Sequence, residues 1–121
     1  MILRRLVAHL SASPWLRSGA VMAMIVIAIL SVAPKQWQWR TGLPPYLEHF
    51  GAFFGVGLVL GVAWPPTRRV ILSLGLLLIA FAGILETLQL WAAGREARLM
   101  DALINVGGAI AGLAIAVWLR R

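Results

Sequence analysis

The sequence predicts an all-α integral membrane protein, a four-helix bundle of transmembrane helices that forms a single domain over residues 1–121. Two observations predict it. Hydrophobic residues make up 61% of the 121 residues and charged residues only 12%, and the apolar residues gather in runs long enough to cross the ~30 Å hydrocarbon core as helices. A soluble domain of this length could not bury so much apolar surface in one small core, because most of its residues lie near the surface.

Four apolar runs are the expected membrane spans. They cover about residues 16–33, 47–64, 70–93 and 102–119. Prolines, which interrupt helices, stand at the breaks between the first three runs, at positions 34, 44, 45, 65 and 66. Gly94 is expected as the C-cap of the third helix and Asp101 as the N-cap of the fourth.

The segment before the first run has two interpretations. Its apolar residues fall on one side of a helix, with Arg4, Arg5 and His9 on the other, which suits a short N-terminal interfacial helix on the inner leaflet. A disordered basic tail fits equally well. The first run itself is expected to be a retained helix and not a signal peptide, because Pro34 would directly follow the cleavage-like Ser31-Val32-Ala33.

Positive charge predicts the topology. Four spans put both termini on one side of the membrane, and that side carries seven basic residues: Arg4, Arg5, Arg17, Arg68, Arg69, Arg120 and Arg121. The other side carries four: Lys35, Arg40, Arg95 and Arg98. The positive-inside rule therefore predicts an N-in/C-in, multi-pass membrane protein. The six tryptophans fall at span ends or in the outer loop, which is typical of two aromatic belts.

The net charge of +7 does not indicate nucleic-acid binding, because the basic residues lie in short segments between apolar runs and form no stripe. Membrane lipids are the expected partners. The chain has no cysteine, which excludes disulfides, thiolate metal ligands and thiol nucleophiles. We expect no cofactor.

Polar side chains in or beside the spans gather at one depth. His49 follows Glu48 at the start of the second run, and Arg95 lies in the loop before the fourth. Two further pairs are spaced to share a helix face, Glu86 with Gln89 and Asp101 with Asn105. In the predicted topology these groups lie in the outer third of the membrane. The candidate ligand site therefore consists of His49, Glu86, Gln89, Arg95, Asp101 and Asn105.

This cluster has more than one interpretation. A carboxylate in the bilayer costs ~2.5 to 3.5 kcal/mol, so Glu86 should face the bundle, either paired with Arg95 or protonated. Intramembrane hydrogen bonds return only ~0.6 to 2 kcal/mol each, which favours a ligand site over a purely structural network. An enzyme or translocase in which Glu86 or His49 handles a proton stays open, but we assign no catalytic residue, because the only nearby nucleophile, Thr87, should point away. A metal site is disfavoured because no closely spaced histidine pair is present.

Glycine pairs four residues apart predict close helix packing through small-xxx-small contacts. The pairs are Gly51 and Gly55, Gly57 and Gly61, and Gly108 and Gly112. Packing within the bundle is the expected use. A homodimer face is the alternative, although nothing else in the sequence indicates a homo-oligomer.

The spaced pattern over about residues 46–119 resembles a known family. The motifs are Glu86-x-x-Gln89, Gly94-Arg95 and Asp101-x-x-x-Asn105-x-x-Gly108-x-x-x-Gly112, and they resemble the signature of the VanZ-like membrane protein family. The pair His49-Phe50 is also similar. Two positions depart from the family pattern, which has an Asp-Lys pair near Pro45-Tyr46 and a small polar residue in place of Arg98.

The resemblance implies a small multi-spanning protein of the cell envelope, located in the bacterial inner (plasma) membrane. The family is named for a protein associated with low-level resistance to the glycopeptide teicoplanin, so an effect on glycopeptide susceptibility is one implication, although resistance does not carry over by name alone. We expect the outer site to bind a polar or anionic envelope component, such as a lipid-linked cell-wall precursor or a phospholipid headgroup.

Overall fold

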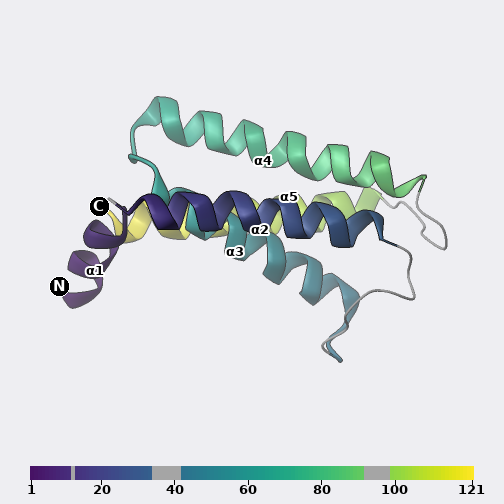
Figure 1. The fold of residues 1–121 in the computed structure, drawn as a ribbon, viewed down its shortest axis with the longest axis horizontal. Coiled ribbons are helices and arrows are strands. Elements are labelled where there is room, and N and C mark those ends of the chain that lie inside the picture. The colour runs from purple at the N-terminus through teal and green to yellow at the C-terminus, as the bar shows by residue number, and fades with distance from the viewer. Residues whose placement is uncertain (12, 34–41, 92–98) are drawn as a thin grey trace.

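The computed structural model of the chain is all-α and describes residues 1–11, 13–33, 42–91 and 99–121 (Figure 1). The described residues form five helices: α1 (Ile2–Ser11), α2 (Pro14–Val32), α3 (Pro45–Ala63), α4 (Arg68–Gln89) and α5 (Leu99–Leu119). The last four are long and apolar enough to span a membrane, and each coincides with one predicted span. The protein is therefore a multi-pass membrane protein.

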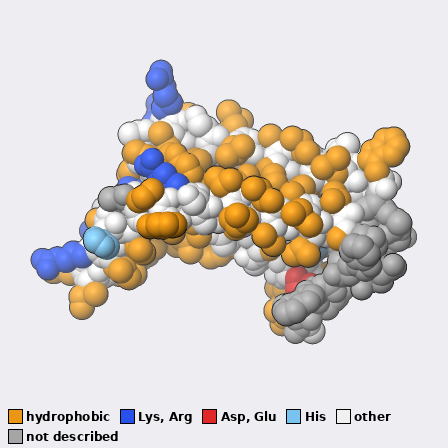
Figure 2. All heavy atoms as spheres, in the orientation of Figure 1, with side chains coloured by type: hydrophobic (Ala, Val, Ile, Leu, Met, Phe, Trp, Pro, Cys, Tyr) orange, Lys and Arg blue, Asp and Glu red, His pale blue; other side chains and the backbone are white. Residues whose placement is uncertain are grey.

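The two ends of the bundle differ in their chain termini and in their charged side chains. Both termini lie at one end, from which α2 and α4 lead away and to which α3 and α5 return (Figure 1). We call this the terminal end, and the opposite end, where α3 and α5 begin and α4 finishes, the loop end. The arginine side chains of the described residues that are in view in Figure 2 gather at the terminal end, whereas the acidic side chain in view lies at the loop end.

The helix boundaries follow local chemistry. Pro45 is the first residue of α3, a position where proline removes no intrahelical hydrogen bond. Thr67 caps α4, because its hydroxyl accepts a hydrogen bond of 3.3 Å from the Val70 N–H. Asp101 is not the N-cap that we expected. It lies inside the first turn of α5, which begins at Leu99, and its carboxylate there still meets the positive end of the helix dipole.

The third span is shorter than predicted, because α4 ends at Gln89 and not near residue 93. The predicted C-cap Gly94 lies outside the described residues.

Residues 2–11 form a helix, which agrees with the first interpretation of this segment and not with a disordered tail. Val7 is buried against Val62 and Ala116, so α1 is attached to the terminal end of the bundle. Ile2 and Leu3 remain exposed. A basic helix with exposed apolar side chains is suited to a membrane interface.

The core is formed mainly by α3, α4 and α5. α4 buries one stripe of side chains spaced three and four residues apart, Leu74, Leu78, Ala82 and Leu85, as an inward helix face requires. These pack with Phe53, Val56 and Leu60 of α3. In contrast, the only buried residue of the fully described α2 is Ala20, so this helix presents most of its apolar side chains outward, toward lipid.

The closest helix pair is α3 with α5, which run parallel and touch through their backbones. A Cβ added to Gly108 would collide with the Phe50 carbonyl, and one added to Gly112 would collide with the Phe54 carbonyl. Gly57 lies equally close to the Ala109 carbonyl. The absence of side chains at these glycines is therefore what lets the two backbones approach.

Gly51 and Gly55, which we expected to pack against a helix, do not do so among the described residues. No atom of that part of the chain lies within 4 Å of where a Cβ would stand on either residue. The side of α3 that meets α5 is the side of Phe50 and Phe54, and the residue after each lies about 100° further around the helix. The spacing of this pair is right for packing, but its helix face is turned away from α5.

Candidate functional site

Five of the six residues predicted to form a polar site lie at the loop end. His49 is in the first turns of α3, Glu86 and Gln89 are in the last turns of α4, and Asp101 and Asn105 are in the first turns of α5. The sixth, Arg95, lies outside the described residues.

The two polar residues of α4 continue its inward stripe. Gln89 comes four residues after the buried Leu85 and is itself only 3% exposed. Glu86 comes four residues after the buried Ala82, so it lies on the same face; it is half-buried and its Oε2 atom is fully buried. The last two turns of this stripe therefore change from apolar to polar while they keep facing the bundle.

α5 makes the same change at its start. Asn105 precedes the packed Gly108 by one turn and is 3% exposed, so the contact of Gly108 with Phe50 holds Asn105 beside the beginning of α3. Its Oδ1 is buried and has no hydrogen-bond partner among the described residues. Asp101, four residues earlier on the same face, is half-buried.

His49 completes the arrangement from α3. It is half-buried and lies four residues before Phe53, whose ring contacts that of Phe81 on α4 with 5.7 Å between centroids. His49 therefore lies on the side of α3 that faces α4.

The arrangement at the loop end combines three kinds of hydrogen-bonding group. Its members are two amides, two carboxyl groups and one imidazole, carried by three helices. Within the described residues, no three His, Asp or Glu side chains are grouped closely enough to hold a metal ion.

A second polar arrangement, at the terminal end, was missed by the sequence analysis. In α3 the carbonyls of Gly61 and Val62 would normally accept from the N–H four residues later, but those residues are Pro65 and Pro66, which have none. Arg120 supplies the donors. Its Nη1 lies 3.1 Å from the Gly61 carbonyl oxygen and 3.0 Å from that of Val62, and it also donates to the Trp64 carbonyl.

Arg17 of α2 joins the same helix end. Its Nε donates to the Ala63 carbonyl at 3.0 Å, and its guanidinium lies 5.3 Å from the centre of the Trp64 ring. Both arginines place positive charge at the negative end of the α3 dipole. Desolvation by burial lowers the pKa of Arg120. We call these hydrogen bonds from Arg17 and Arg120 to the end of α3 the closure of α3. The signal that could have revealed it is the double proline, which predicts two helix carbonyls that need a donor from outside the helix.

Comparison with curated proteins and with solved structures gives no match. The model of the VanZ/LLP1 family, in contrast, matches residues 10–120. That range contains all four candidate spans and every residue predicted for the polar site, including the loop arginine, and it confirms the resemblance that the spaced motifs indicated. The chain therefore belongs to the VanZ/LLP1 family.

Proposed function

We propose that this VanZ-family protein binds the phosphate-containing headgroup of an envelope lipid at the loop end, in the outer leaflet of the bacterial inner membrane. The headgroup belongs either to a phospholipid or to a lipid-linked cell-wall precursor. The residues that bind it are His49, Glu86, Gln89, Arg95, Asp101 and Asn105.

The buried side-chain oxygen of Asn105 is the observation that carries the proposal. A buried acceptor without a donor costs about 1 to 3 kcal/mol, and the described part of the bundle supplies no donor to this Oδ1 atom. A network that served only to hold helices together would use that acceptor within the protein. A hydroxyl or ammonium group of a bound headgroup would provide the donor.

The charges support the same ligand class and leaflet. Arg95 and Arg98 follow α4 in the sequence and match the charge of a phosphate. The terminal end carries more basic residues than the loop end, so the positive-inside rule directs the loop end to the extracytoplasmic side.

Native mass spectrometry of the protein extracted with its own membrane lipids tests the proposal. We expect the wild type to keep a lipid whose mass identifies it as a phospholipid or as a lipid-linked precursor. Asn105→Leu and Arg95→Ala should each reduce the retained lipid roughly tenfold or more, the effect of losing one hydrogen bond to a charged group.

Thr87→Val is the matched control for these variants. Thr87 lies at a similar depth, is exposed, and donates its hydroxyl hydrogen bond to the Gly83 carbonyl of its own helix at 2.9 Å. We therefore expect it to retain lipid like the wild type. Unchanged retention in both Asn105→Leu and Arg95→Ala would contradict the proposal and leave the cluster as a structural network.

The leaflet is tested by cysteine labelling, for which the chain is suited because it contains no cysteine. A membrane-impermeant maleimide added to intact cells should label Ala97→Cys in the segment between α4 and α5. It should not label Pro66→Cys between α3 and α4. The reverse pattern would place the polar site on the cytoplasmic side and contradict the outer-leaflet assignment.

An effect on teicoplanin susceptibility follows if the retained lipid is a cell-wall precursor. In that case a strain that carries Asn105→Leu in place of the wild type should show the susceptibility of the deletion strain. A phospholipid ligand predicts no such difference.

A further inference from the structure

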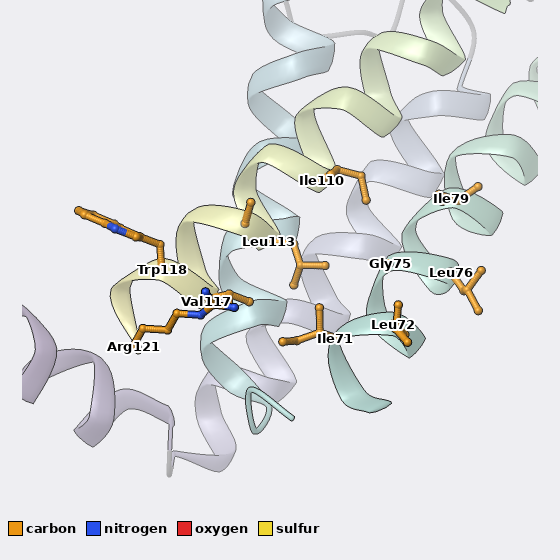
Figure 3. Close-up of a pocket in the computed structure, with 11 residues that line it drawn as sticks. Ile71, Leu72, Gly75, Leu76, Ile79, Ile110, Leu113, Val117, Trp118 and Arg121 are labelled. Carbon is orange, nitrogen blue, oxygen red and sulfur yellow. The ribbon is translucent and has the colours of Figure 1, made fainter. Parts of the chain in front are cut away.

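A groove of about 550 Å³ lies between α4 and α5 in the half of the bundle near the terminal end (Figure 3). Its walls are apolar and include Ile71, Leu76, Ile110, Leu113 and Trp118. Arg121 lies at the end of the groove, where its side chain extends beside Val117 (Figure 3). The volume is within the range of small-molecule pockets.

Small residues keep the groove open. Gly75 of α4 and Ala114 of α5 both line it. A Cβ added to Gly75 would meet no atom of the described residues within 4 Å, in contrast to the packed glycines of the α3–α5 contact. The described part of the protein therefore leaves the space beside Gly75 unfilled.

The length of the groove fits one leaflet. Along α5 it extends from Ile110 to Trp118, which corresponds to a rise of about 12 Å for an α-helix, and Arg121 lies two residues beyond the end of this helix. Half of the ~30 Å hydrocarbon core is about 15 Å. The groove is apolar along its length and charged where it reaches the terminal end of the bundle. A groove of this kind, running from the interface toward the midplane, has the dimensions of a lipid chain with its headgroup.

The arginines around this groove differ from those that close α3. Arg68 and Arg69 begin α4 and line an adjoining hollow that shares Leu72 and Leu76 with the groove. The described acidic residues are Glu48, Glu86 and Asp101, all in the turns at the loop end. Within the described residues, Arg68, Arg69 and Arg121 therefore have no acidic partner, and their charge is available to an anion from outside the protein.

We propose that this groove holds an acyl chain of an anionic phospholipid from the leaflet at the terminal end, with Arg121, Arg68 and Arg69 attracting its phosphate. Positive charge at the rim is complementary to such a headgroup. A second copy of the chain packed symmetrically in the groove would instead bring like-charged arginines together. The groove lies in the opposite half of the bundle from the loop-end polar cluster, so a result that contradicts one proposal does not contradict the other.

Quenching of Trp118 by brominated lipid tests the proposal. The full-length protein is placed in phosphatidylcholine vesicles that contain a minor fraction of acyl-brominated phosphatidylglycerol or, in a parallel series, acyl-brominated phosphatidylcholine. The Trp118→Phe variant identifies the part of the quenching due to this side chain. We expect the anionic lipid to be preferred, with the preference falling roughly fivefold in Arg121→Gln.

A matched glycine pair tests the groove itself. Gly75→Leu should fill it and abolish the anionic preference of the Trp118 quenching. Gly83→Leu adds the same side chain to the same helix, also into open space but outside the groove, and should leave the preference intact. Asn105→Leu should also leave it intact, which separates this site from the headgroup site at the loop end.

Three results would overturn the proposal. One is equal quenching by the two brominated lipids in the wild type, which would mean ordinary lipid contact. Another is unchanged anionic preference in Gly75→Leu. The third is a dimer in native mass spectrometry that Gly75→Leu dissociates and Gly83→Leu does not, which would make a second copy the occupant.

Discussion

The two ends of the bundle differ in whether a buried hydrogen-bond acceptor has a donor among the described residues. At the terminal end, the α3 carbonyls deprived of donors by Pro65 and Pro66 accept hydrogen bonds from Arg120. At the loop end, the Asn105 side-chain oxygen is buried and no donor reaches it from the described residues. The first end is completed by the protein's own side chains, whereas the second presents an acceptor that a ligand can satisfy. In the function that we propose, the first kind of polar group stabilises the fold and the second binds a ligand.

The largest loss of stability is expected for a change at the contact between α3 and α5, which fixes the position of these two helices relative to each other. Gly112→Ala adds a Cβ against the Phe54 carbonyl and the Leu58 nitrogen, backbone atoms that move only with their helix. We expect the free energy of unfolding to fall by about 3 kcal/mol, the upper part of the range for overpacking. Reversible denaturation in mixed micelles measures it.

Gly55→Ala is the control, since it adds the same atom to a glycine with open space around it. Because alanine favours helix more than glycine, this variant should be stabilised by about 0.5 to 1 kcal/mol. Equal destabilisation of the two variants would contradict the assignment of the packed face.

A smaller loss of stability is expected when the hydrogen bonds of Arg120 at the terminal end are removed. Arg120→Met keeps a long side chain but leaves the Gly61 and Val62 carbonyls without their donor, which should lower the free energy of unfolding by about 2 kcal/mol. Arg121→Met, which removes the same charge from a residue outside this closure, should change stability by less than about 0.5 kcal/mol. If the neighbouring variants behaved alike in the same denaturation assay, the hydrogen bonds of Arg120 would not matter to stability.

The smallest expected change in the free energy of unfolding is at the loop end, and it is an increase. Asn105→Leu keeps the branched shape of the side chain and removes the buried acceptor, so we expect the lipid-free protein to be stabilised by about 1 kcal/mol. The same variant should lose headgroup binding. Destabilisation of the lipid-free protein would show that Asn105 serves the structure, and the contrast between the two ends would then disappear.

Much of the fold could be predicted because membrane spans are long apolar runs interrupted by prolines. Spacings of three and four also predicted that Glu86 shares a helix face with Gln89 and Asp101 with Asn105, whereas Arg95 lies outside the described residues. What spacing does not reveal is which face of a helix meets a neighbour. Gly51 and Gly55 have the same spacing as the packed Gly108 and Gly112, but their face is turned away from α5.

The closure of α3 could not be predicted from charge patterns alone. Arg17 and Arg120 were interpreted only as topology signals, because in the sequence they are interchangeable with the other arginines of their side. Their partners are backbone carbonyls of a different helix, and hydrogen bonds to these depend on the three-dimensional register of α2, α3 and α5.

The closure also determines when α3 can be completed during synthesis. Arg120 lies 56 residues after Trp64, whose carbonyl it contacts. At about 5 to 20 residues per second, a ribosome needs roughly 3 to 11 seconds to make that length of chain. For this interval α3 has neither its closest packing partner, α5, nor the donor for its Gly61 and Val62 carbonyls, and only the Ala63 carbonyl can already accept from Arg17. The end of the newly inserted helix therefore stays incomplete until α5 and Arg120 have been made.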